Sequence, residues 1–178
     1  MAEPDSARRR GWLVPLVIAA VIAAWIGFTL IGGRLLPEGS AAPEFSLPRP
    51  DGTMLSLAEL RGKVVVLDFW SVTCPPCLEE LPTLASLWRR MESRGVVVVG
   101  IAAGGESRQD VARFAKERGI DYPLAVDGSG SISAAYRISA LPTIYVISRE
   151  GTVAASHVGA WSGRDLVAAV ESALRSGH

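Results

Sequence analysis

The sequence predicts an α/β fold, with a mixed central sheet flanked by helices, behind one N-terminal transmembrane helix. Three observations support this fold class. Apolar strand-like runs alternate with amphipathic helical segments over most of the chain. The last two strand-like runs are joined by a short turn, which indicates an antiparallel pair in the same sheet. A long uncharged apolar run precedes all of these elements.

The uncharged run covers residues 11–33 and consists mainly of Val, Ile, Ala, Leu, Trp and Phe. A helix of about 20 such residues spans a bilayer. Arg8, Arg9 and Arg10 precede the run, which predicts that residues 1–10 stay in the cytoplasm. We therefore expect a single-pass protein of the cell membrane. The anchor would lie in the lipid bilayer, and the C-terminal domain would lie on the extracytoplasmic (periplasmic or outer) side.

A cleaved signal peptide is the alternative, and the arginines also faintly resemble a twin-arginine export signal. The apolar part of a signal peptide is only about 7–15 residues long, shorter than this run. The best small-residue cleavage site, at 40–42, is followed by Pro43, a poor residue after a scissile bond. We expect the mature protein to keep its N-terminus, and N-terminal sequencing that began near Pro43 would contradict this.

Composition limits the function classes. The 178 residues include 18 basic and 18 acidic ones, so the formal net charge is zero. The basic runs are short and far apart, so we expect no nucleic-acid partner. The two cysteines are three residues apart, whereas a disulfide scaffold needs several distant pairs.

Residues 34–43 are rich in Gly, Pro, Ser and Ala and predict a linker, so the domain is expected over 44–178. Within it, continuous or alternating apolar runs predict strands, and apolar residues at three- and four-residue steps predict helices. Asp51-Gly52 predicts the turn of an N-terminal β-hairpin. In chain order the expected elements are strands 45–47, 53–57 and 63–70, a helix from 75 that Gly95 ends, strand 96–102, a helix from 107 that closes at Gly119, strand 123–126, helix 131–136, strands 143–148 and 152–158, and a helix from 162.

Cys74 and Cys77 lie where the strand 63–70 gives way to a helix. There the sulfur of Cys74 would face unpaired backbone N–H groups and the positive end of the helix dipole, which favour the nucleophilic thiolate. Pro75 suits a first helical turn, because its missing N–H would have no helical partner. We therefore predict a redox-active disulfide, with Cys74 as nucleophile and Cys77 as the thiol that resolves the mixed disulfide.

The same spacing of two cysteines also occurs in half a zinc site, in a local structural disulfide, and in a pair of buried thiols. A structural zinc site usually takes four protein ligands. Only His157 and His178 could complete one, and neither has ligand spacing. We therefore expect no metal.

The run LDFWSVTCPPC at 67–77 resembles the active-site strand and turn of thioredoxin. Over residues 43–174 the chain resembles the TlpA/ResA-like membrane-anchored thiol-disulfide oxidoreductases of the thioredoxin superfamily. Pro82 matches the proline that kinks the active-site helix in such proteins, and the run at 141–143 matches their cis-proline loop. The resemblance implies a thioredoxin-like fold with an N-terminal hairpin and a strand-helix insertion, which 116–136 matches.

The resemblance also implies an enzyme that carries out dithiol-disulfide exchange without a bound cofactor. Its substrates would be exported proteins with cysteines or disulfides, including the haem-attachment cysteines of c-type cytochromes, and a membrane protein would donate electrons to it. The resemblance favours reduction over oxidation. One sequence does not set that direction, which depends on the reduction potential and on the partner that recharges the pair.

Asp68 matches the buried acid beneath the second cysteine of thioredoxin, and the resemblance implies that it accepts a proton from Cys77. An acid in an apolar strand either has a raised pKa or finds a partner, so a hydrogen-bonded acid at a strand end is the alternative. The strand 96–102 lacks the lysine that partners this acid in thioredoxin.

Pro142 completes the expected catalytic set of Cys74, Cys77, Asp68 and Pro142. A cis bond before Pro142 would expose the backbone of Leu141 to an extended substrate segment, while an ordinary strand-entry proline is the alternative. The residues expected to contact substrate are Trp70, Thr73, Pro75, Pro76, Leu141 and Thr143.

The pattern departs from the family at Thr73, where tryptophan is usual before the first cysteine. The change replaces a large apolar lid by a small polar surface, which bears on partner identity and not on the redox chemistry.

A peroxiredoxin-like peroxidase is an alternative function, since Ser71 stands three residues before Cys74. Its motif also wants proline where this chain has Leu67. A copper chaperone using the cysteine pair and His157 is a second alternative, and an assembly factor whose disulfide never turns over is a third.

Overall fold

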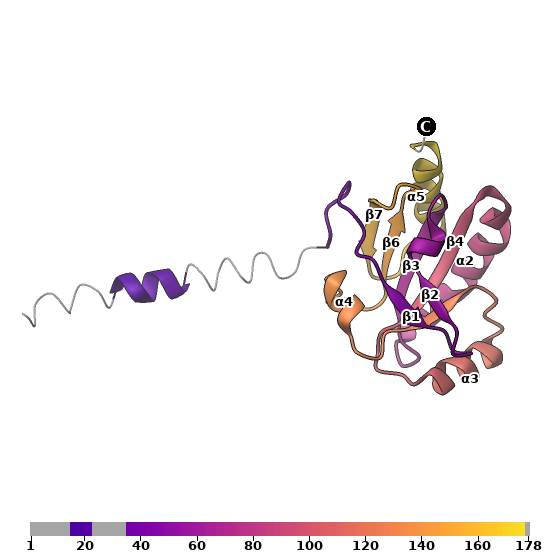
Figure 1. Cartoon of the computed structure of the whole chain (residues 1–178), viewed down its shortest axis with the longest axis horizontal. Helices are drawn as coiled ribbons and strands as arrows, with labels where there is room; N and C mark the ends of the chain where they lie inside the picture. The colour runs from indigo at the N-terminus through magenta and orange to yellow at the C-terminus, as the bar shows by residue number, and fades with distance from the viewer. Residues whose placement is uncertain (1–14, 23–34, 177–178) are drawn as a thin grey trace, which may run out of the picture. The chain divides into compact units, whose positions relative to one another are not determined.

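The computed structural model describes residues 15–22 and 35–176 (Figure 1). The chain divides into two units, 1–34 and 35–178. In the first unit, residues 15–22 form a short helix with exposed side chains. No helix in the described ranges has the length and apolarity needed to cross a bilayer. Most of the predicted anchor, 11–33, and the whole predicted cytoplasmic segment lie outside these ranges.

The second unit is built around a five-stranded mixed sheet with the strand order β5-β4-β3-β6-β7. β3 is parallel to β4, which is parallel to β5, whereas β6 is antiparallel to both β3 and β7. Every residue of β3 and β4 is buried, as their continuous apolar runs predict. The strands are β3 (Val64–Trp70), β4 (Val96–Ala102), β5 (Leu124–Val126), β6 (Thr143–Ile147) and β7 (Val153–Val158).

Each face of the sheet is covered by a different set of elements. Three helices pack with the side chains of one face: α2 (Pro75–Met91), α3 (Arg108–Arg118) and α5 (Gly163–Arg175). The other face packs against the hairpin β1 (Ser46–Pro48) and β2 (Met54–Ser56), and against the segment around α4 (Ser131–Ala135). Short 3₁₀ helices cover Ala58–Leu60 and Glu92–Arg94. The predicted α/β class, the hairpin and the helices of the domain after residue 44 are confirmed, with ends that differ by a few residues.

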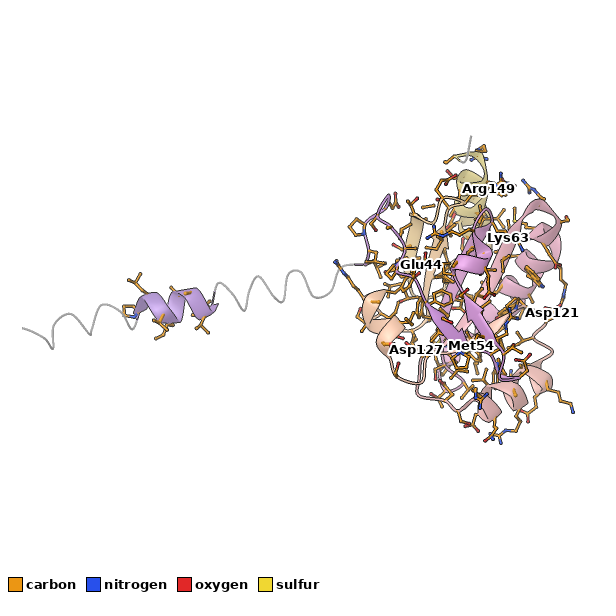
Figure 2. The ribbon with its side chains drawn as sticks, in the orientation of Figure 1. Glu44, Met54, Lys63, Asp121, Asp127 and Arg149 are labelled. Atoms are coloured by element: carbon orange, nitrogen blue, oxygen red, sulfur yellow. A yellow bond between two sulfur atoms is a disulfide. The ribbon has the colours of Figure 1, made fainter. Side chains whose placement is uncertain are left out.

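Local interactions set several of these ends. The hydroxyls of Ser107 and Ser162 cap α3 and α5, each accepting a hydrogen bond from a backbone N–H three residues later. Asp127, labelled in Figure 2, is buried at the end of β5. Its Oδ2 accepts hydrogen bonds from the N–H and the hydroxyl of Ser133, 2.7 and 2.8 Å away, and so holds α4 in place.

Gly39, Ser40 and Ala42, in the segment predicted as a linker (34–43), make backbone hydrogen bonds with the domain. The N–H of Gly39 donates to the carbonyl of Val153 over 2.8 Å, and the N–H of Val153 donates to the carbonyl of Ser40 over 2.8 Å. β7 lies at the sheet edge, where its first backbone groups would otherwise lack partners. The paired part of the domain therefore begins before residue 44.

Candidate active site

The two cysteines form a disulfide at the start of α2, at the edge of the sheet where β3 and β4 end. Cys74 is the N-cap residue of α2 and is half-buried. Cys77, one turn further on, is only 1% exposed. An attacking disulfide or thiol therefore reaches Cys74 first, as the assignment of Cys74 as nucleophile requires.

The chain holds Cys74 by a small number of backbone contacts. Its N–H donates to the carbonyl of Ser71 over 3.2 Å, and its Sγ accepts from the N–H of Cys77 over 3.3 Å. Pro75 and Pro76 occupy the first two helical positions and carry no N–H. Among the described residues, the sulfur of Cys74 therefore has one backbone donor, whereas a helix N-terminus without prolines offers more.

A second loop lies at the same edge of the sheet. Thr143 pairs with Phe69 across β6 and β3, which brings Leu141 and Pro142 to the end of β3 that leads into the cysteines. The Leu141–Pro142 peptide bond is cis, as predicted. The carbonyl of Pro142 accepts from the N–H of Gly159 over 2.8 Å, which ties this loop to the segment after β7.

Asp68 lies inside the domain, 1% exposed, on β3. Its Oδ1 has no hydrogen-bond partner within the described part of the chain. Its neighbour on β4 is Gly100, which has no side chain that could pair with the acid. Burial, and then the charge of Glu80, raise the pKa of Asp68 well above its usual value. A buried carboxyl group with a raised pKa and a second acid as its charged neighbour is a candidate proton-transfer group.

Glu80 is a second buried acid that the sequence did not single out. It is 4% exposed on α2, one turn after Cys77. Its Oε1 accepts from the N–H of Trp161 over 2.7 Å, while Oε2 has no partner among the described residues. Burial raises the pKa of Glu80, and the Trp161 N–H offsets part of that rise. One feature of the sequence could have indicated that Glu80 is buried: it lies three residues after Cys77, on the face of the helix that carries apolar residues.

The residues expected to contact substrate separate into two groups. Thr73, Pro75 and Pro76 are exposed and Leu141 is half-buried, so these four can be reached from outside. Trp70 and Thr143, by contrast, are both fully buried, so their side chains are not reached from outside in this structure. Trp70 packs against Phe114 of α3, and Thr143 donates its hydroxyl to the carbonyl of Ala140.

The described residues bring together no group of three or more His, Cys, Asp or Glu side chains that could hold a metal ion. His157 lies on β7 opposite Ile144, and its ring stacks on Trp161 with the centroids 5.1 Å apart. The copper-chaperone alternative needs His157 to join both cysteines, and this arrangement does not supply that ligand set.

Comparisons with known proteins agree with this geometry. Residues 39–156 match the AhpC/TSA family. The chain is 34% identical over 151 residues to the thiol-disulfide oxidoreductase ResA of Bacillus subtilis, covering 82% of this chain and 84% of that protein. A thiol:disulfide interchange protein of the thioredoxin family from Chlorobium tepidum shares its fold with a TM-score of 0.69 and 32% identity, covering 78% and 98% of the two chains.

The peroxidoxin BcpB of Mycobacterium tuberculosis also shares the fold, with a TM-score of 0.68 and 25% identity, covering 80% of this chain and 99% of that one. The peroxidase motif has a proline at the position of Leu67, which here lies in the middle of the fully buried strand β3. The two cysteines here pair with each other one helical turn apart. The site therefore fits exchange between a dithiol and a disulfide better than attack on a peroxide.

Proposed function

Because the chain belongs to the AhpC/TSA family and, within it, to the ResA-like thiol-disulfide oxidoreductases, we propose that it reduces disulfides of exported proteins. The chain is an enzyme of dithiol-disulfide exchange, and its substrates carry cysteines. What we propose beyond this is the direction of the reaction, the compartment in which it takes place, and a membrane protein that reduces the Cys74–Cys77 disulfide again. The haem-attachment cysteines of c-type cytochromes are one substrate class that this reaction would serve.

The reaction proceeds in two exchanges. The thiolate of Cys74 attacks a substrate disulfide and forms a mixed disulfide, and the other substrate sulfur leaves as a thiolate that takes a proton. The thiol of Cys77 then gives its proton to the carboxylate of Asp68 and attacks the sulfur of Cys74. The second substrate thiol leaves, two electrons have passed to the substrate, and the Cys74–Cys77 disulfide remains. A membrane electron donor would reduce that disulfide again.

The observation that carries the reducing direction is the pair of prolines between the cysteines. A dithiol protein becomes an oxidant when its reduced form is strongly stabilised. In the disulfide, the Sγ of Cys74 accepts from the backbone N–H of Cys77 over 3.3 Å, and Pro75 and Pro76 have no N–H to offer a thiolate at this position. The reduced form is therefore weakly stabilised, and we expect a low reduction potential, close to the roughly −270 mV of thioredoxin.

Substitution Pro76→Ala tests this explanation directly. The change restores one N–H at the second helical position, which can donate to the Cys74 thiolate. A hydrogen bond to a charged group is worth about 1.5 kcal/mol or more. We expect the reduction potential to rise by about 30 mV and the pKa of Cys74 to fall by about one unit.

Equilibration with dithiothreitol of known redox state measures the potential, and the pH dependence of alkylation measures the thiol pKa. Pro82→Ala, which removes the exposed proline further along α2, is the matched control and should leave both values unchanged. Equal potentials for wild type and Pro76→Ala, or a wild-type potential as oxidising as about −120 mV, would contradict the reducing direction.

The uncharged run 11–33 and its arginine flank support the extracytoplasmic location. A membrane-impermeant maleimide added to intact bacteria whose outer layer admits it should label Cys74 in the full chain carrying Cys77→Ser. Labelling that requires lysis of the cytoplasmic membrane would place the domain in the cytoplasm and overturn the proposed location.

A further inference from the structure

The carboxylate of Glu106, in the loop after β4, reaches the segment that leads from β3 to Cys74. Its Oε1 accepts from the hydroxyl of Ser71 over 2.5 Å and from the N–H of Val72 over 2.9 Å. Its Oε2 accepts from the N–H of Gly104 over 2.9 Å. One side chain thus joins the loop before the cysteines to the loop after β4.

Gly104 packs closely against the hydrogen-bonded side chains of Ser71 and Glu106. A Cβ atom on Gly104 would overlap the Ser71 hydroxyl and would lie 2.7 Å from Glu106 Oε1. Burial alone would raise the pKa of Glu106, but hydrogen bonds from Ser71 and from backbone N–H groups outweigh it and lower the pKa. Glu106 is therefore ionised at neutral pH and acts only as an acceptor.

The ionised carboxylate fixes the direction of the hydrogen bonds that run toward Thr73. Ser71 has one hydroxyl hydrogen, and it goes to Glu106. The Ser71 oxygen then accepts from both the N–H and the hydroxyl of Thr73, at 3.2 and 3.0 Å. The hydroxyl hydrogen of Thr73 consequently points inward toward Ser71. Thr73 is an exposed residue, so its hydroxyl oxygen would offer only lone pairs to a group that approaches from outside.

We propose that Thr73, oriented by Ser71 and Glu106, is a specificity-determining hydrogen-bond acceptor that binds a backbone N–H of the substrate beside the cysteine under attack. This inference rests on the proposed function and names a feature of its substrates. Thr73 directly precedes the nucleophile Cys74, so an extended chain whose sulfur meets Cys74 passes close to it. Backbone N–H groups are the donors that every polypeptide carries beside a cysteine.

The test uses the reduced full chain and disulfide-linked peptides in which each amide next to the cysteine is N-methylated in turn. At one position, methylation should lower the second-order rate constant of the wild type by about threefold to tenfold, the value of one neutral hydrogen bond. Thr73→Val keeps the shape of the side chain and removes the acceptor. It should react with the methylated and unmethylated peptides at equal rates.

The matched control is Thr152→Val, which removes a hydroxyl from the Ser148–Thr152 pair at the opposite end of the sheet. It should keep the preference of the wild type. Glu106→Gln should also keep it, because the amide oxygen can still accept from Ser71 and Val72, and only the hydrogen bond from the Gly104 N–H is lost. Glu106→Ala should abolish the preference, because the hydrogen of Ser71 is then free to turn toward Thr73.

A preference that survives Thr73→Val, or no preference at any methylated position, would overturn the inference. The aromatic disulfide dithionitrobenzoate has no amide and separates this failure from a failure of the proposed function. If the wild type reduces it but shows no amide preference, only the role of Thr73 is wrong. If the wild type reduces neither dithionitrobenzoate nor the peptides, exchange itself is absent and both proposals fall.

Discussion

Substitution Cys77→Ser traps the substrate on Cys74 as a stable mixed disulfide, and Cys74→Ser lowers turnover by about a thousandfold or more. The half-buried Cys74 is the sulfur that a substrate can reach, whereas Cys77 is 1% exposed beneath it. Without Cys77 the first exchange still occurs, but no internal thiol releases the product. Without Cys74 the nucleophile itself is missing.

Non-reducing gel electrophoresis of the full chain from its own cells, followed by mass spectrometry, measures the trapped complexes and names the substrates. The double variant, with both cysteines replaced by serine, is the control and should trap none. Complexes on the Cys74→Ser variant, with none on Cys77→Ser, would reverse the two roles. If a substrate is bound to the chain only by noncovalent contacts, with no mixed disulfide, the exchange mechanism is excluded for that substrate.

Substitution Asp68→Asn should slow the release of the mixed disulfide by about tenfold, which corresponds to about 1.4 kcal/mol of activation free energy. Asparagine fills the same space but cannot accept the proton that Cys77 must lose before it attacks. Burial raises the pKa of Asp68, and a carboxylate with a raised pKa is a stronger proton acceptor than an ordinary one. Stopped-flow measurement of the second exchange between about pH 6 and 9 tests this, and a profile identical to the wild type would exclude the proton-acceptor role.

The same substitution should stabilise the oxidised protein, and the sign follows from the pKa shift. Burial, and then Glu80, raise the pKa of Asp68 above its unfolded value of about 4. The folded state therefore holds this proton more tightly, and the free energy of unfolding falls as pH rises from the unfolded pKa through the folded one. Asparagine does not titrate, so the variant should gain stability over the wild type at high pH. Denaturant midpoints at about pH 5 and pH 9 measure the difference, and a variant that loses stability on the alkaline side would contradict it.

The parts of the fold that follow from continuous or periodic apolar runs could be predicted from the sequence. β3 and β4 are buried on both faces as their composition indicates, and α2 begins at Pro75 directly after Cys74. The cis bond before Pro142 was predicted from the resemblance of its loop to the thioredoxin one. Strand boundaries were less certain, because hydrogen bonding between distant segments decides them, as the pairing of Ser40 with Val153 illustrates.

The sequence predicted the two cysteines of the site correctly, but it predicted the residues around them less well. Trp70 and Thr143 are near Cys74 in sequence or in topology, but a strand covered on both faces leaves neither side chain exposed. Glu80 and Glu106 were missed for a different reason. Each acts through a contact with a residue at least 34 positions away, Trp161 or the segment at Ser71 and Val72, and one sequence does not show such contacts. Charged residues in a helix or loop usually face solvent, which is the simpler expectation.

The measurement that tests the central claim most directly is the transfer of two electrons from the Cys74–Cys77 pair to a protein disulfide. The reduced full chain is mixed with an equimolar disulfide-linked peptide and quenched with acid, and both masses are determined. We predict that the chain loses the mass of two hydrogens, forming the Cys74–Cys77 disulfide, while the peptide gains two and separates into free thiols. A peptide that stays oxidised beside a chain that keeps both thiols, at a potential low enough to favour transfer, would contradict the assignment of this pair as the working site.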